Sequence, residues 1–385
     1  MTANIKYFDS ARHTGCPAAN AVAGNLLAFL DACLLSGFNT VTVSSLTSSG
    51  GTSTLVASNH GYQVGQWLLV AGANESQYNT EVKVKTVVDA NTLTFDTPSG
   101  APASATGTIT AKVAPLGWTK PFSGTNLAAY RAPTGKQHYL RVDDTNTYGA
   151  VVWGAETMSS ISAGTGIYPG GGGTSFVNTC EWQKAYTSPY RYILVGDDRR
   201  FFLLPAVQAS QYGYNVYFFG DYTPYNASDA SPVMLAADRT LSYLSGGYAY
   251  PAGYSQGTYM TTSPSAKAYL SRSAAGALAG DGVWLARGYP GGAAWASGSP
   301  TSFSYDTQTP LQAIVALGCE VFDVTAGGFG MRGNMPGLYM FPQKMTGLFA
   351  TGNVITLGGK DLLLVLSSVV SNTAGMAGFD LTGPW

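Results

Sequence analysis

The sequence predicts a mainly β protein, in which a β-sandwich-like main domain carries a short N-terminal helix and a small inserted β-sandwich or barrel module. The 385 residues include 48 glycines and 24 tyrosines, and short alternating apolar runs end in Gly, Asn or Asp. Such runs with tight turns between them are typical of antiparallel strands. We expect residues 1–40 to be part of the main domain, residues 41–113 to form the module and residues 114–385 to form the main β-rich domain.

The clearest helical pattern is NAVAGNLLAFLDACLL, residues 20–35. Leu26, Leu30 and Leu34 recur at helical spacing, and Gly37 follows as a candidate C-terminal cap. The apolar face of this helix is wide, so the helix needs a surface to pack on. Two interpretations stay open: these leucines pack on the chain's own main domain, or they form an assembly contact with another subunit.

After the helix, apolar and polar residues alternate in five short runs: TLVASN, QWLLVAGA, EVKVKTVVDA, NTLTFDT and TGTITAKV. Together with the turn from Gly61 to Gly65 and the Gly72-Ala73 step, these runs make residues 41–113 resemble small β modules inserted in tail and fibre proteins of tailed bacteriophages. A module whose ends lie close together can be inserted in a loop of its host. The module is therefore a second candidate contact surface, as an outward projection, or else a passive ornament.

Composition excludes several classes of protein. The formal net charge is −1 and only 11% of residues are charged, which argues against a nucleic-acid partner. So few charges favour a surface that is partly covered by subunit contacts. The four cysteines lack metal-site spacing, and we expect buried free thiols, no cofactor and no membrane span. The N-terminus lacks the pattern of a signal peptide.

Adjacent carboxylates stand out in YRYILVGDDRRFFLL, residues 190–204. Asp197 and Asp198 lie between two strand-like runs, and this favours a hairpin turn over an acid/base site. Strand-like runs also end at Asp144 and at Asp221, so three acidic strand ends could converge on one calcium ion. The sequence contains no DxDxDG loop, and we expect no metal site.

Catalytic motifs are missing from the chain. His13, His60 and His138 are far apart, and neither GxSxG nor HExxH occurs. Glu156 and Glu181 are candidates for the paired carboxylates of a glycosidase, yet no local pattern brings them together. We see no solenoid repeat of the kind that glycan depolymerases use. The sequence therefore predicts no catalytic residue, and we expect that the protein is not an enzyme.

The order of five segments carries a more specific resemblance: LGWTKPFSGTNLAAYRA, YLRVDD, GAETMSSISAGTG, YILVGDDRRFFLL and VYFFGDY. In this order they resemble a family of tailed-bacteriophage virion structural proteins, over about residues 1–222. The resemblance implies a particle component whose partners are copies of itself and other virion proteins. It also implies a protein that is made in the host cytoplasm and located in the virion.

Three functions follow as hypotheses. The first is a structural component of the tail, baseplate or collar. The alternative is a capsid decoration or fibre subunit that binds host-surface glycan through loop aromatics, for which the candidates are Tyr250, Tyr254, Trp284 and Trp295. The third is a glycan-cleaving enzyme of the tailspike type, which needs two acids about 5 to 10 Å apart in a cleft.

Overall fold

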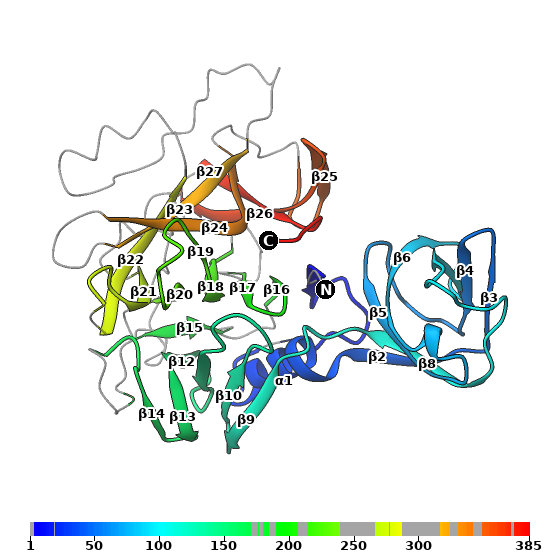
Figure 1. The fold of residues 1–385 in the computed structure, drawn as a ribbon, viewed down its shortest axis with the longest axis horizontal. Helices are drawn as coiled ribbons and strands as arrows, with labels where there is room; N and C mark the ends of the chain where they lie inside the picture. Colours follow the sequence, from blue (N-terminus) through cyan, green and yellow to red (C-terminus); the bar gives the residue numbers. More distant parts are fainter. Residues whose placement is uncertain are drawn as a thin grey trace.

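The chain is mainly β, as the sequence predicts. The structure, a computed structural model, describes residues 4–18, 20–170, 176, 180–184, 190–206, 214–238, 266–276, 278–286, 316–323, 330–341, 349–370 and 373–385. Its strands pair antiparallel in two large sheets, and a short hairpin is formed by β13 (Thr157–Ser160) and β14 (Ala163–Thr165). Figure 1 shows a large body with a smaller lobe beside it.

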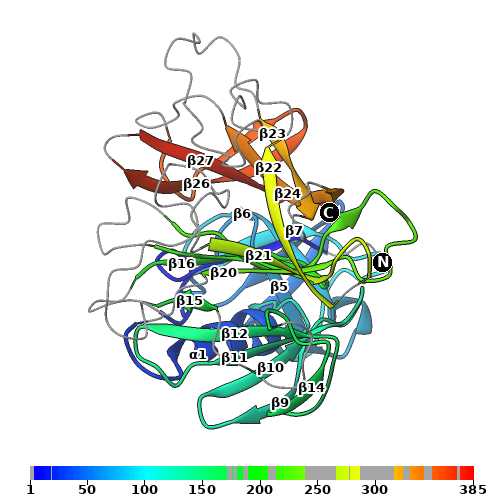
Figure 2. The ribbon, with the colours of Figure 1, turned by 90° about the vertical axis from the view of Figure 1, so that its left-hand side faces the viewer.

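Eighteen of the described strands belong to the sheet of the body. Figure 2 shows this sheet bent into layers, with β26 and β27 above β20 and β21, and with β11 and β12 below them. The N-terminal strand β1 pairs with β16, whose other neighbour is β17. The strands are β1 (Lys6–Asp9), β9 (Thr119–Gly124), β10 (Leu127–Arg131), β11 (Tyr139–Asp143), β12 (Gly149–Ala155), β15 (Glu181–Gln183), β16 (Tyr192–Gly196), β17 (Arg200–Pro205), β18 (Tyr217–Asp221), β19 (Thr223–Pro224), β20 (Val233–Asp238), β21 (Ala266–Arg272), β22 (Leu278–Ala286), β23 (Leu317–Asp323), β24 (Gly330–Phe341), β25 (Val354–Leu357), β26 (Lys360–Val370) and β27 (Thr373–Asp380).

Aromatic rings fill the centre of the body. The rings of Trp182 and Tyr217 stack with their centroids 5.9 Å apart, and Trp118 meets Phe201 edge-on at 5.3 Å. All four side chains are buried. Offset and edge-to-face pairs of this kind add to the free energy gained by burying the rings. The high tyrosine and tryptophan content is thus used, in this part of the chain, for core packing.

The predicted helix is present but shorter than its periodic pattern. It comprises α1 (Asn25–Asp31) and one π-helical turn, Ala32–Ser36. Gly24 begins it with φ 83°, and Gly37 ends it with φ 70°. A Cβ on Gly37 would lie 2.2 Å from the carbonyl oxygen of Val113, so this position requires glycine.

The three helix leucines are core residues. Leu26, Leu30 and Leu34 are fully buried in the same apolar cluster as the body strands. This corrects the assembly-contact interpretation, because a side chain without exposed surface has none to offer a second subunit. The other interpretation, packing on the chain's own main domain, describes what the structure contains.

A buried ion pair caps the helix from a distant part of the chain. Oδ2 of Asp144 accepts hydrogen bonds from the backbone N–H groups of Leu26 and Leu27, at 2.9 and 3.2 Å. Its Oδ1 accepts from Nζ of Lys184 at 2.5 Å, and the same ammonium donates to the carbonyl of Val22. Both charged side chains have no exposed surface. A carboxylate at a helix N-terminus satisfies orphan N–H groups and complements the helix dipole.

The second large sheet forms the smaller lobe, which we call the module. Its strands are β2 (Phe38–Thr42), β3 (Ser45–Ser49), β4 (Thr52–Val56), β5 (Trp67–Ala73), β6 (Glu81–Val87), β7 (Thr92–Asp96) and β8 (Gly107–Val113), in the order β2-β8-β5-β6-β7-β4-β3. A 3-10 turn, Ser76–Tyr78, follows β5. Strands β2 and β8 pair with Phe38 opposite Val113, so the chain enters and leaves the module side by side.

The GDDRR segment is a hairpin turn, which confirms the prediction. Strands β16 and β17 pair on either side of it, and the N–H of Asp197 bonds to the carbonyl of Arg200 at 2.9 Å. Oδ1 of Asp197 accepts from the N–H groups of Arg199 and Arg200, at 2.7 and 2.9 Å. The carboxylate of Asp198 instead accepts from the hydroxyl of Thr134 at 2.7 Å. The two acids therefore diverge and hold the turn.

Replacing Asp144 with alanine tests the helix cap. The variant leaves the ammonium of Lys184 buried without its partner, so we expect the free energy of unfolding to fall by about 3–5 kcal/mol. Asp143→Ala is the matched control, because that neighbouring side chain is 30% exposed; we expect a loss of about 1 kcal/mol or less. Urea denaturation followed by circular dichroism measures both. Similar losses from the two variants would contradict the cap.

Candidate functional site

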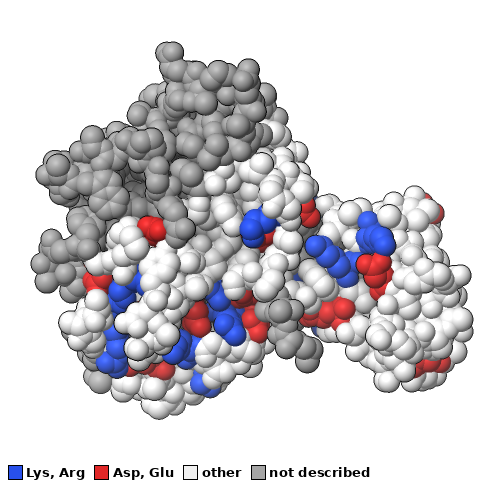
Figure 3. Space-filling model, turned by 45° about the horizontal axis from the view of Figure 1, so that its top comes forward, with Lys and Arg blue, Asp and Glu red and all other residues white. Residues whose placement is uncertain are grey.

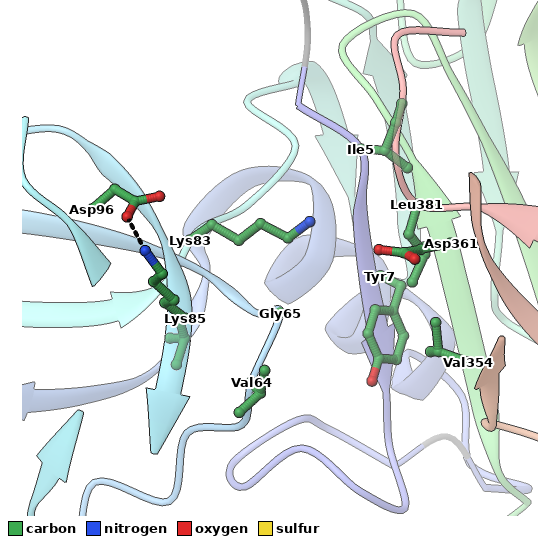
Figure 4. A pocket seen from close by; sticks show the side chains of 11 residues that line it. Ile5, Tyr7, Val64, Gly65, Lys83, Lys85, Asp96, Val354, Asp361 and Leu381 are labelled. Carbon is green, nitrogen blue, oxygen red and sulfur yellow. Dashed lines mark hydrogen bonds and ion pairs between the residues drawn. The ribbon is translucent and has the colours of Figure 1, made fainter. Parts of the chain in front are cut away.

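A cleft of about 400 Å³ lies between the module and the body (Figure 4). One wall comes from the β4–β5 loop, β6 and β7 of the module, and the other from the N-terminal segment, β25, the start of β26 and the end of the chain. The module wall comprises Val64, Gly65, Lys83, Val84, Lys85 and Asp96, and the body wall comprises Ile5, Tyr7, Val354, Asp361 and Leu381.

Lys6 fixes the two walls to each other. Its Nζ donates to Oε1 of Glu81 on the module at 2.5 Å and to the carbonyl of Pro115, also at 2.5 Å. The amide of Asn4 donates to the other oxygen of Glu81 at 3.2 Å. Burial lowers the pKa of Lys6, and the Glu81 carboxylate acts against this shift. A charge pair between buried Lys6 and half-buried Glu81 therefore joins the two sides of the cleft.

The walls of the cleft present exposed apolar and charged side chains. Val64 is 59% exposed and Val354 is 47% exposed. Lys85 pairs with Asp96 at 2.7 Å, whereas Lys83 has no ion pair with any described residue. Figure 4 shows Lys83 reaching from the module toward the body, where the Asp361 carboxylate lies on the facing wall. A cleft with exposed valines and an ammonium that pairs with no described carboxylate has the features of a binding site.

A second hollow, of about 480 Å³, lies where β24 changes partner from β19 to β27. Its charged residues, Lys360 and Asp380, already form an ion pair with each other. Lys360 also lies over the ring of Tyr339, 5.7 Å from its centroid. Because these groups satisfy one another, the cleft beside the module is the better candidate site.

Only one wall of this cleft can be predicted from local sequence. In EVKVKTV the residues Glu81, Lys83 and Lys85 alternate with buried valines, so they share one outward face of β6. Nothing local marks Val354 or Asp361, which are near the other end of the chain. These residues meet the lysines only through the tertiary fold.

The candidate glycan-binding aromatics are left as predictions. Tyr250, Tyr254 and Trp295 lie outside the described residues. Trp284 lies on β22, opposite Val321 of β23, and the structure describes only its backbone. The cleft does not draw on this part of the chain.

The candidate glycosidase acids do not meet. Glu181 lies opposite Val151 on β15, whereas Glu156 follows the far end of β12. Five residues of strand separate these positions by about 16 Å, more than a glycosidase pair allows. Glu156 also forms a bidentate ion pair with Arg272, with hydrogen bonds of 2.5 and 2.7 Å.

The fold does bring together a histidine and a serine that the sequence left apart. Nε2 of His138 lies 3.4 Å from Oγ of Ser231, and its Nδ1 lies 3.2 Å from the hydroxyl of Tyr168. Oγ of Ser231 also lies 2.9 Å from that of Ser271, whose hydroxyl donates to the carbonyl of Ser231. All four side chains are buried.

One direction of donation satisfies this whole network. The phenol of Tyr168 donates to Nδ1 of His138, Nε2–H donates to Ser231, and Ser231 donates to Ser271. In that arrangement the imidazole gives a proton to the serine oxygen, whereas a general base must accept one. The network is thus arranged to hold β21, which contains Ser271, to three segments that lie outside the named strands.

Burial decides the charge of this histidine. It lowers the pKa of His138 to about 4, and the Glu156 carboxylate offsets only part of the shift. His13 shows the same direction for the same reason, with its pKa also lowered to about 4. Both imidazoles are therefore neutral near pH 7.

The acidic strand ends do not form a metal site within the described part of the chain. No group of three or more His, Cys, Asp or Glu side chains is placed there to hold a metal ion. The three acidic strand ends instead bind separate partners: the helix N-terminus, the GDDRR turn and the N–H of Lys136.

Among the described helices, none is long and apolar enough to cross a membrane. The four cysteines are buried free thiols, which confirms that expectation.

Similarity to known proteins was found among solved structures. No family model matches the chain, and no curated protein matches it. Among solved structures, a phage phi92 endosialidase matches with 10% identity and a TM-score of 0.17. The match covers 90% of this chain, and the chain spans about half of that structure, 52%. A TM-score this low means that the two folds do not superpose as wholes.

This match corrects one expectation from the sequence. The matched protein is an endosialidase, which is an enzyme, and it contradicts the expectation that the present chain is not an enzyme. That expectation is withdrawn.

The buried histidine gives a prediction about pH. Because the folded state holds His138 neutral down to about pH 4, while the unfolded chain binds a proton near pH 6.5, its contribution is complete above pH 6.5 and is lost as the pH falls toward 4. We expect the stability of the wild type relative to His138→Gln to fall by about 1.4 kcal/mol per pH unit in that window. Urea denaturation of both proteins at several pH values measures this difference. A constant difference from pH 7 to 4 would contradict the assignment.

Proposed function

We propose that the chain is a structural component of a tailed-bacteriophage virion, which assembles with copies of itself and with other virion proteins in the tail, baseplate or collar region. The proposal is carried by where the motifs that resemble the virion family lie in the fold. YLRVDD, YILVGDDRRFFLL and VYFFGDY form β11, the β16–β17 hairpin and β18, which are strands of the body sheet. The segments that carry the resemblance are therefore structural strands of the body sheet.

Two properties of the surface support the proposal. The chain has only 11% charged residues, and Figure 3 shows the described part of one face as mostly uncharged, with Lys, Arg, Asp and Glu gathered on the lower body and near the module. A sparsely charged surface suits a protein that covers part of it with neighbouring subunits. The module adds a lobe that stands beside the body, where a neighbour can reach it.

The oligomeric state of the purified chain tests this proposal. We expect a defined oligomer by size exclusion coupled to light scattering, stable over about a hundredfold range of concentration, and visible as a symmetric particle or ring in negative-stain images. The same preparation is assayed for binding and cleavage of bacterial glycans, including sialic-acid polymers. A monomer that cleaves a glycan would replace the structural proposal with the third hypothesis, and a monomer that only binds one would favour the fibre or decoration role.

A further inference from the structure

Strand β25 has a free edge within the described part of the chain. Among the described strands it pairs only with β26, through a hairpin whose two-residue turn is Gly358-Gly359, both with positive φ. In such a hairpin the residues that flank the turn form a hydrogen-bonded pair, and the pattern then alternates. The bond from the N–H of Leu364 to the carbonyl of Asn353, 2.8 Å long, agrees with this alternation.

The alternation fixes which backbone groups face outward. Leu357 and Ile355 bond to β26, so the N–H and C=O groups of Val354 and Thr356 point away from it. The strand sequence, VITL, has no charge and no proline, the devices that commonly protect an edge. An open, β-branched edge of this kind is a template for another strand.

This edge borders the cleft beside the module. Val354 belongs to both, and it lies on the wall that faces Val64 of the module. On the module side Lys83 has no ion pair with a described residue, and on the body side the Asp361 carboxylate accepts from Thr356 at 2.7 Å. The cleft thus combines outward backbone groups, two exposed valines and a positive charge that has no ion pair within the described part of the chain.

We propose that the cleft binds an extended segment of a neighbouring virion protein, which adds to β25 as a further strand. The segment carries an apolar side chain that packs between Val64 and Val354, and an acidic side chain that pairs with Lys83. Its backbone bonds to the outward groups of Val354 and Thr356, along a strand of about 13 Å. In strand addition the main-chain bonds supply affinity and the side-chain contacts supply specificity. The identity of the occupant as a virion protein rests on the proposed function.

Two features favour a peptide over other occupants. The outward N–H and C=O groups have the spacing of a strand, which a peptide backbone matches along its whole length. The module stands across the cleft from β25 and is joined to the body by the Lys6–Glu81 pair. A single extended segment fits between them more readily than the edge of another folded body.

The test uses the full-length chain and two fluorescein-labelled peptides, TVEVTV and TVKVTV. We expect saturable binding of TVEVTV, measured by fluorescence anisotropy, at peptide concentrations below about 1 mM. Thr356→Pro removes an outward N–H that β26 does not use, and it should weaken binding about tenfold. Thr356→Val is the matched control, since it loses the hydroxyl bond to Asp361 but keeps the N–H, and its affinity should stay within about twofold of the wild type.

A charge reversal gives an independent readout that does not depend on the strand. Lys83 is exposed, so Lys83→Glu should fold normally; it should weaken TVEVTV and strengthen TVKVTV, each by about tenfold. Absence of saturable binding to the wild type, or equal binding by Thr356→Pro and Thr356→Val, would overturn the proposal. A defined oligomer that binds neither peptide would refute the cleft while leaving the structural role intact. Peptide binding by a monomer that cleaves glycan would refute the structural role and the virion partner, and leave only the peptide site.

Discussion

The ion pair between Asp144 and Lys184 links parts of the chain that are far apart in sequence. Asp144 follows β11, Lys184 follows β15, and the helix they cap precedes the module. A short helix with a wide apolar face gains little stability by itself, so it depends on this cap and on burial of its leucines. Because both charges are fully buried, the pair is stable only when all three segments are in place. The helix can therefore take its position only when the strands that precede Asp144 and Lys184 have formed.

The helix in turn determines where the module attaches. Its π turn ends at Gly37, and β2 begins at the next residue and pairs with β8. The carbonyl of Val113 comes so close to Gly37 that no side chain fits there. The Lys6–Glu81 pair adds a second junction nearby, because Lys6 also donates to the carbonyl of Pro115, two residues after Val113. Two junctions therefore join the module to the body beside the cleft.

Acidic residues illustrate how one residue type takes different roles in this fold. Asp197 holds a turn, Asp144 caps a helix and Glu81 joins the module to the body. In the sequence all three look like unassigned carboxylates beside strand-like runs. Their roles differ because their neighbours in space differ. A carboxylate is stabilised by whichever hydrogen-bond donors the fold brings to it. The same holds for His138, whose serine and tyrosine partners come from two other segments.

Local pattern determined the β class, the helix at Leu26–Leu34 and the GDDRR hairpin. These depend on period, on turn chemistry and on residues within a few positions of one another, and the sequence displays such information directly. It also displayed the outward face of β6, with Lys83 and Lys85 in alternation. Tertiary structure alone decided that this face looks across a cleft at Val354 and Asp361, and that the helix leucines lie in the core. Such contacts join residues hundreds of positions apart, and their free energy comes from packing and burial that no local window of sequence contains.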